Sequence, residues 1–133
     1  MRQRARREVA EPLSRSAVGQ RAELAVADYL VANGFDVLGR NLRFGPLELD
    51  LVVQNGPLVA IVEVRTRGPG ALEGPFESVG ARKRARIVRA TERLWREVLC
   101  AAPGVSRVRI DVAAVTFDGD ATRVDYIEGA ITG

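Results

Sequence analysis

Two runs of mainly apolar residues, separated by only four residues, limit what this chain can fold into. The run Leu47–Val53 reads Leu-Glu-Leu-Asp-Leu-Val-Val, and Leu58–Arg65 is similarly rich in Val, Ile and Leu. Short apolar runs bounded by turn residues are typical of strands that lie covered within a sheet. Asn55 and Gly56 mark a reversal between the two runs. The sequence therefore predicts two neighbouring strands in a buried sheet.

Two further segments have the periodicity of amphipathic helices. In Ser16–Asn33, apolar residues recur at spacings of three and four, and Gly34 supplies a C-terminal stop. In Ser78–Cys100, an apolar side lies opposite a series of arginines. The apolar positions are Val18, Ala22, Ala25, Val26, Tyr29 and Leu30 in the first segment and Ile87, Thr91, Leu94, Trp95 and Val98 in the second.

The remaining patterns complete an α/β fold. Phe35–Arg40 is predicted to be a strand, and so is the alternating run from Val108 to Ala114. Asp118-Gly119-Asp120 is a turn before a short strand at Arg123–Glu128, whereas Thr66–Glu77 has too many Gly and Pro residues for regular structure and is expected to be a mobile loop. The order helix, three strands, helix, two strands predicts a mixed central sheet flanked by helices.

Length and composition are those of one globular domain. The chain has 133 residues, of which 47% are hydrophobic and 28% charged. Residues 1–15 are Arg-rich and nearly without apolar side chains, so we expect a flexible basic arm followed by a single domain at residues 16–133. Neither a signal-peptide pattern nor an apolar run of membrane-spanning length is present, which predicts a cytoplasmic protein.

The residue types that are missing exclude several chemistries. The chain has no histidine, so imidazole bases and histidine-bound metals are excluded. Cys100 is the one cysteine, which excludes an intrachain disulfide and a cysteine-cluster zinc site. Any metal bound by this chain is therefore expected to have oxygen ligands.

The hairpin brings acidic residues together if its register is right. Pro57 has no N–H to close a two-residue turn at Asn55-Gly56, so a four-residue loop closed by Val53 and Leu58 is favoured. Both loops give one register, in which Asp50 lies opposite Ile61 and Glu48 opposite Glu63. Since side chains alternate along a strand, Glu48, Asp50, Glu63 and Arg65 would project from one face.

Carboxylates gathered on one face of a sheet repel one another. Protonation, a neighbouring arginine or a divalent cation relieves the repulsion. Two alternatives stay open: Glu48 is an ordinary solvated strand residue, or Glu63 and Arg65 form a surface ion pair. The apolar neighbours of Asp50 and Glu63 favour a specific role for these two acids.

The two helices carry further candidates. Glu23 lies at the edge of the apolar stripe of the first helix, either directed toward the sheet or facing solvent. Lys83, the single lysine among twenty basic residues, lies beside Ile87 and Ala90 on the second helix. The arginine series on that helix is either a solvated face or a surface with the spacing of nucleic-acid phosphates, and comprises Arg82, Arg86, Arg89, Arg93 and Arg96.

Together these residues resemble a known family. The motifs, in chain order, are Gly19-Gln-Arg-Ala-Glu23, Ala27-Asp-Tyr-Leu30, Gly34-Phe35, Arg40-Asn41, Glu48-Leu-Asp50-Leu51, Val62-Glu63-Val-Arg65-Thr-Arg67, Lys83 and Arg109-Ile-Asp111-Val112. They resemble the YraN family of uncharacterised bacterial proteins, which by resemblance belongs to the PD-(D/E)XK nuclease superfamily and is similar to archaeal Holliday-junction resolvases. The resemblance covers about residues 16 to 128.

The resemblance implies a restriction-endonuclease-like core and a metal-dependent endonuclease. Asp50 and Glu63 would be ligands of Mg²⁺ or Mn²⁺, with Glu23 as a further ligand, direct or through water. The substrate would be branched or structured DNA, with Arg67 and the arginine series as nucleic-acid contacts. Because junction-cleaving relatives work as dimers, a second copy of the chain is a further candidate partner.

Arg65 occupies the position of the signature lysine of this superfamily. An arginine cannot act as a base, although it can stabilise charge at the transition state. Lys83 lies where a helix after the core strands could project its amine into the same site. Three functions follow as hypotheses: a nuclease, a nucleic-acid-binding module that cleaves nothing, and an assembly partner in DNA processing.

Overall fold

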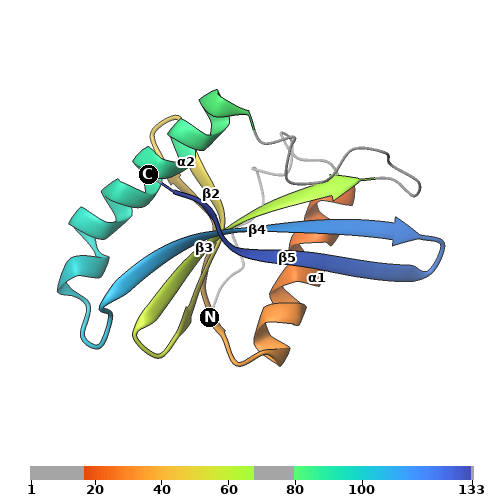
Figure 1. The fold of residues 1–133 in the computed structure, drawn as a ribbon, viewed down its shortest axis with the longest axis horizontal. Helices are drawn as coiled ribbons and strands as arrows, with labels where there is room; N and C mark the ends of the chain where they lie inside the picture. Colours follow the sequence, from red (N-terminus) through yellow and green to blue (C-terminus); the bar gives the residue numbers. More distant parts are fainter. Residues whose placement is uncertain (1–16, 68–79, 133) are drawn as a thin grey trace.

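A mixed β-sheet runs through the part of the chain that the computed structural model describes, residues 17–67 and 80–132 (Figure 1). In chain order the elements are α1 (Ala17–Ala32), β1 (Asp36–Phe44), β2 (Leu47–Asn55), β3 (Leu58–Arg67), α2 (Ala81–Glu97), the short 3-10 helix η4 (Leu99–Ala101), β4 (Arg107–Asp118) and β5 (Ala121–Ile131). The five strands lie in the order β1-β2-β3-β4-β5. Neighbours are antiparallel except β3 and β4, which are parallel.

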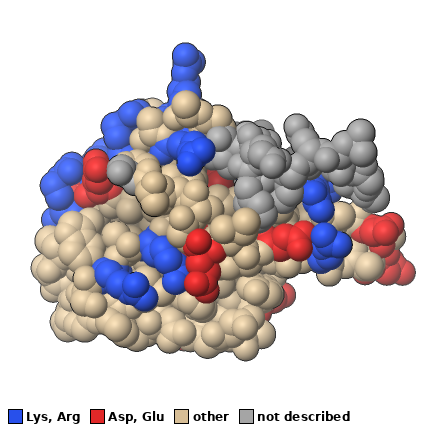
Figure 2. All heavy atoms as spheres, in the orientation of Figure 1, with Lys and Arg blue, Asp and Glu red and all other residues tan. Residues whose placement is uncertain are grey.

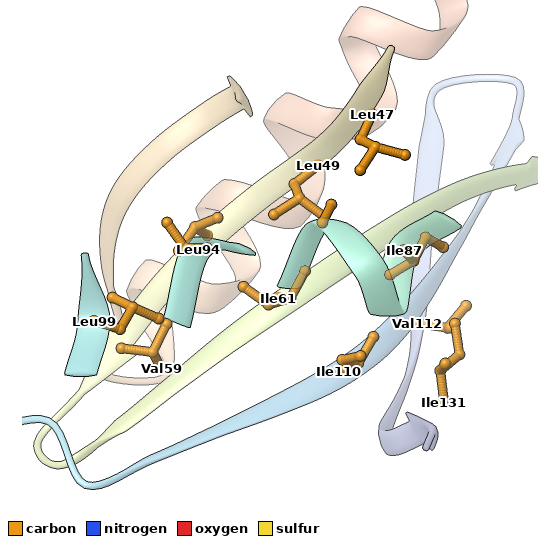
Figure 3. Close-up of a cluster of buried hydrophobic side chains, with 12 residues drawn as sticks. Leu47, Leu49, Val59, Ile61, Ile87, Leu94, Leu99, Ile110, Val112 and Ile131 are labelled. Carbon is orange, nitrogen blue, oxygen red and sulfur yellow. The ribbon is translucent and has the colours of Figure 1, made fainter. Parts of the chain in front are cut away.

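A helix covers each face of this sheet. Two parallel neighbours need a crossover connection, and α2 lies in the one between β3 and β4. The core on the α2 side is shown in Figure 3 and consists of Leu47, Leu49, Val52, Val59, Ile61, Ile87, Ala90, Leu94, Leu99, Ile110, Val112 and Ile131. The core on the α1 side consists of Ala22, Val26, Ala27, Leu30, Leu51, Val53, Ala60, Val62, Ala113 and Val115. The predicted α/β class, a central mixed sheet flanked by helices as in a restriction-endonuclease-like core, is confirmed.

Helix α1 has the predicted position but a rotated buried side. Ala22, Val26 and Leu30 are buried as expected. Val18 and Tyr29, predicted to belong to the apolar stripe, are 47% and 37% exposed, whereas Glu23 and Ala27 are buried. The Tyr29 ring packs on the Tyr126 ring at 5.7 Å between centroids, so it lies at the rim of the core.

Several element boundaries differ from the prediction. Thr66 and Arg67 belong to β3 and not to a loop, because both pair with β4. Helix α2 ends at Glu97, and Val98, predicted to be apolar-side, is 51% exposed. The predicted basic arm and most of the predicted loop, at residues 68–79, lie outside the described residues. Neither α1 nor α2 is long and apolar enough to cross a membrane.

The hairpin turn between β2 and β3 is tighter than predicted. Asn55 pairs with Leu58, so the turn consists of Gly56 and Pro57. Gly56 has φ 61°, and glycine is favoured at the first central position of such a turn. Pro57 is then a central residue whose missing N–H is not needed for closure. The predicted four-residue loop is wrong, and the register moves by two residues.

Candidate functional site

The pairing of β2 with β3 stops where the acidic residues begin. The last pair is Leu51 with Val62, and the next residues on the two strands are Asp50 and Glu63. Ile61, the predicted partner of Asp50, pairs with Val52 instead, and Asp50 and Glu63 are the first residues beyond the last pair on their strands. Because the shift is even, Asp50 and Glu63 still meet, as the parity argument predicts.

Asp50 replaces a backbone group in the sheet. The Val64 N–H donates a hydrogen bond of 2.9 Å to Oδ2 of Asp50. On the other side of β2, Leu42 pairs with Leu49 and Arg40 with Leu51, and Asn41 between them has φ 53°. Asn is among the few residues that adopt this left-handed conformation at low cost. The backbone is thus irregular on both sides of Asp50.

This irregularity reverses the side-chain alternation of β2. Leu47 and Leu49 both lie in the α2-side core, whereas Leu51 lies in the α1-side core. Glu48, between Leu47 and Leu49, must therefore project toward the α1 side. Val59 and Ile61 lie in the α2-side core, and Glu63 follows them at the same two-residue spacing on β3, so its side chain also points to the α2 side. The prediction that Glu48 shares a face with Glu63 is wrong.

Asp50, Glu63 and Lys83 form the centre of the site. Glu63 is 4% exposed, and its carboxyl lies close enough to that of Asp50 for the two to interact electrostatically. The Lys83 Nζ lies 2.9 Å from Oε2 of Glu63. Burial, followed by the charge of Asp50, raises the pKa of Glu63 from 4.5 to about 7, although Lys83 opposes the shift. A second cation near this pair would be stabilised electrostatically.

The sequence of α2 explains how Lys83 reaches Glu63. Lys83 precedes Ile87 by one helical turn, and Ile87 is buried against the sheet. The Lys83 side chain is 45% exposed, so its aliphatic part can lie along the protein surface while the amine reaches the acid. A lysine in the first turn opposes the helix dipole by roughly 0.3–1 kcal/mol. The Glu63 carboxylate compensates for this unfavourable position.

Other predicted residues lie around this centre. Glu23 is 3% exposed on α1, which covers the opposite face of the sheet from α2. No three Asp, Glu or Cys side chains assemble into a metal-binding group within residues 17–67 and 80–132. Glu23 as a third ligand, direct or through water, therefore stays a prediction. Arg65 is partly buried two residues after Glu63, which places the two side chains on the same face of β3.

The arginine series lies on the outer surface of α2. Arg82, Arg86, Arg89 and Arg96 are exposed, while Arg93 is partly buried. The Nε of Arg93 lies 3.1 Å from Oε2 of Glu97, and its guanidinium lies 5.3 Å from the centroid of the Phe44 ring. Figure 2 shows basic side chains along the edge of the molecule where Figure 1 places α2. The predicted basic face exists, with Arg93 partly occupied by other contacts.

Arg67 is directed toward a different part of the sheet. Its Nε donates to Oγ1 of Thr116 at 3.2 Å, and its Nη2 lies 3.9 Å from Oδ2 of Asp125. Thr116 and Asp125 belong to β4 and β5. Arg67 thus ties the end of β3 to its neighbours.

Asp111, whose role the sequence leaves open, anchors the β4–β5 pair. It is 0% exposed and accepts hydrogen bonds from Nε and Nη2 of Arg109 at 2.8 and 3.0 Å. It also accepts from Oη of Tyr126 at 2.6 Å and from the Gly129 N–H at 2.8 Å. The sheet register shifts between Ile110 and Val112, and Asp111 fills this irregularity. In the sequence, the spacing of Arg109 and Asp111 two residues apart on an apolar strand is the pattern that indicates this network.

The donor set of the centre suits a hard divalent cation. Mg²⁺ is commonly held by one or two carboxylates together with water and substrate phosphates, and Asp50 with Glu63 supplies two. Burial, followed by the charge of the neighbouring Asp50, raises the pKa of Glu63, as expected for a buried carboxyl that has a second one beside it. Asp50 and Glu63 therefore fit Mg²⁺ or Mn²⁺.

The fold and this site define an α/β protein whose acidic centre lies where the pairing of two central strands ends. Comparison with known proteins gives the family. The family described as "Uncharacterised protein family UPF0102" matches residues 22–115, and the chain belongs to this family. The resemblance seen in the motifs is confirmed at that level.

Individual relatives match most of the chain. A UPF0102 protein of Sorangium cellulosum is 50% identical over 119 residues, covering 88% of this chain and 82% of the relative. UPF0102 proteins of Anaeromyxobacter dehalogenans and Ectopseudomonas mendocina are 38% and 37% identical, covering 90% and 88% of this chain and 87% and 96% of the relatives. The matches therefore span the region that contains the site.

Proposed function

We propose that this chain is a metal-dependent nuclease-like protein that hydrolyses phosphodiester bonds in branched or structured DNA. The observation that carries the proposal is the proximity of Asp50 to the buried Glu63, whose Oε2 lies 2.9 Å from the Lys83 amine. Carboxylates beside a flexible cation are the groups that phosphodiester hydrolysis requires. The exposed arginines of α2 provide a surface for the phosphate backbone.

Each group has a distinct task in this mechanism. Asp50 and Glu63 would hold Mg²⁺ or Mn²⁺, which when bound neutralises phosphate charge and lowers the pKa of a water molecule. The Lys83 ammonium donates hydrogen bonds to the scissile phosphate or the attacking water. The Val64 N–H fixes one oxygen of Asp50, so the carboxylate keeps its orientation. Arg65 donates to phosphate oxygens on the same face.

Lys83 therefore supplies the lysine that position 65 lacks. Arg65 follows Glu63 on β3, while Lys83 reaches Glu63 from α2. Lysine can carry or release a proton, whereas the guanidinium of arginine stays charged. The hydrogen-bonding amine thus comes from the helix, and the strand arginine adds only positive charge.

The alternative is a nucleic-acid-binding module that does not cleave, including one that acts as an assembly partner in DNA processing. One observation favours it: the Lys83 amine lies 2.9 Å from Oε2 of Glu63 and compensates the charge of this acid. In that protein the ion pair would join α2 to the sheet, and the arginines of α2 would bind phosphates unaided.

Cleavage assays separate these functions. Wild-type protein is incubated with branched and linear DNA of matched sequence in Mg²⁺ or Mn²⁺. We expect metal-dependent cleavage of branched DNA, loss of activity in Asp50→Asn, and roughly a 100-fold loss in Lys83→Met, the scale for removing one hydrogen-bond donor to the transition state. Arg65→Lys should raise the rate.

Matched variants control for charge and folding. Arg84→Met removes an exposed cation next to Lys83, and Asp118→Asn neutralises an exposed acid at the end of β4, so both should cleave like wild type. Unchanged cleavage in Asp50→Asn would reject the acidic centre. Salt-sensitive DNA binding without cleavage by any variant would favour the binding module.

A further inference from the structure

A cavity of about 400 Å³ lies between the second half of α2 and the first residues of β4, away from the acidic centre. Its volume is within the range of roughly 300–1,000 Å³ that is typical of sites for organic ligands. Its wall is mainly apolar. The lining residues are Thr91, Glu92, Trp95, Arg96, Ser106, Arg107 and Val108.

Trp95 gives this cavity an aromatic wall. It is the single tryptophan of the chain and is partly buried against the α2-side core, as is Val108 on the facing strand. Packing against the core fixes the indole in place without covering it completely. Rigid, partly exposed indoles stack on nucleobases with little dependence on base identity.

The rim of the cavity attracts a phosphate chain. Arg96 and Arg107 are both exposed, and Glu92 is the single acid among the lining residues. Two guanidinium groups beside an aromatic wall can hold the phosphates on either side of a stacked base. The wall is therefore apolar with polar groups at its edge.

The cavity and the acidic centre lie along one helix. Trp95 follows Lys83 by twelve residues, which corresponds to about 18 Å along α2. Twelve residues also correspond to about three and a third turns, so Trp95 lies roughly a third of a turn around α2 from Lys83.

From this arrangement we propose that the cavity beside Trp95 is a binding site for an unpaired nucleobase, held by stacking on the indole with its phosphates on Arg96 and Arg107. The site reads an unstacked base, which duplex DNA does not offer, and so selects structures with single-stranded segments. The proposal rests on the proposed action on nucleic acid and names the feature of the substrate that the protein recognises.

Fluorescence of Trp95 tests this site directly because no other tryptophan contributes. The full chain is titrated in EDTA with an eight-nucleotide oligothymidylate, with an abasic deoxyribose-phosphate strand of the same length and with a blunt duplex. Binding is followed independently by the anisotropy of a labelled strand. We expect quenching by oligothymidylate and none by the abasic strand or the duplex.

Variants add a second measurement. Trp95→Leu should weaken oligothymidylate binding roughly 5- to 150-fold, the equivalent of one stacked base, and leave the abasic strand unaffected. Should Trp95→Leu fold poorly, Arg107→Ala replaces it, because that residue is exposed. It should weaken binding of both strands. Arg123→Ala, on the exposed part of β5, is the control and should bind like wild type.

The outcomes distinguish the two proposals. Equal binding of thymidylate and abasic strands without quenching overturns the base site and leaves the nuclease proposal intact. Quenching and base-dependent binding without cleavage in Mn²⁺ supports the base site and rejects the nuclease. Absence of binding to all three nucleic acids overturns the base site, and cleavage of branched DNA in Mn²⁺ then decides the nuclease proposal separately.

Discussion

Replacing Glu63 with glutamine should stabilise the protein at alkaline pH. Burial and Asp50 raise the pKa of Glu63 from 4.5 to about 7 in the folded protein. The folded state therefore binds more protons than the unfolded state between these two values, and stability falls as pH rises through them. A difference of this size corresponds to about 3 kcal/mol, fully present below pH 4.5 and lost above pH 7. Glutamine does not ionise, so the variant avoids this loss.

The measurement is urea unfolding followed by Trp95 fluorescence at several pH values from 4.5 to 8. The free energy of unfolding of Glu63→Gln minus that of wild type should increase by about 3 kcal/mol over this range. A constant offset between the proteins reports the altered contacts, whereas the change with pH reports the ionisation. Glu97→Gln, at an exposed ion pair with Arg93, is the matched control and should show no such trend.

A difference between Glu63→Gln and wild type that varies by less than about 0.5 kcal/mol from pH 4.5 to 8 would refute the reasoning. It would mean that Glu63 ionises as in an unfolded chain, and that Asp50 and burial do not act on it.

Three other predictions concern the site and its supports. Mg²⁺ or Mn²⁺ at ten times its Kd should raise the Tm of wild type by about 5 °C and leave Asp50→Asn unchanged, as checked by thermal melts. Asp111→Ala should lower the free energy of unfolding by about 4 kcal/mol, because it strands buried donors, whereas Asp125→Ala should cost less than about 1 kcal/mol; a loss below 1 kcal/mol for Asp111→Ala would reject the anchor. Asn41→Val should cost roughly 1–2 kcal/mol more than Asn41→Gly in urea unfolding, and equal values would show that the left-handed backbone is not strained.

Periodicity predicted most of the fold because burial dictates it. The stripe through Val26 and Leu30 identified α1, and Gly34, at φ 92°, ends it as expected. The turn at Asp118-Gly119-Asp120 was predicted from its residue types, and Gly119 does adopt a positive φ of 63° there. Tyr29 and Val18 were misplaced, since apolar spacing alone does not say which side of a helix meets the sheet.

The candidate site was predictable in part. Asp50 and Glu63 were correctly expected near each other although the predicted turn was wrong. A register error of two residues leaves each side chain on the same face of the sheet. The predicted position of Glu48 was wrong because the hydrogen bond from the Val64 backbone to Asp50 interrupts the alternation of side chains along β2. That bond depends on tertiary geometry and leaves no pattern in the sequence. Lys83 was predicted from its place on a helical wheel, since one turn connects it to a buried residue.

The bond between Asp50 and the Val64 amide has a dynamic consequence. In a regular sheet, a neighbouring strand protects each amide, and its exchange with solvent reports on the whole ladder. Here the Asp50 carboxylate, and not the backbone of a neighbouring strand, accepts the hydrogen bond of the Val64 amide in β3. A ligand or proton that binds Asp50 therefore competes with this backbone hydrogen bond. The rate of deuterium uptake at the Val64 amide should then report whether the acidic residues are occupied.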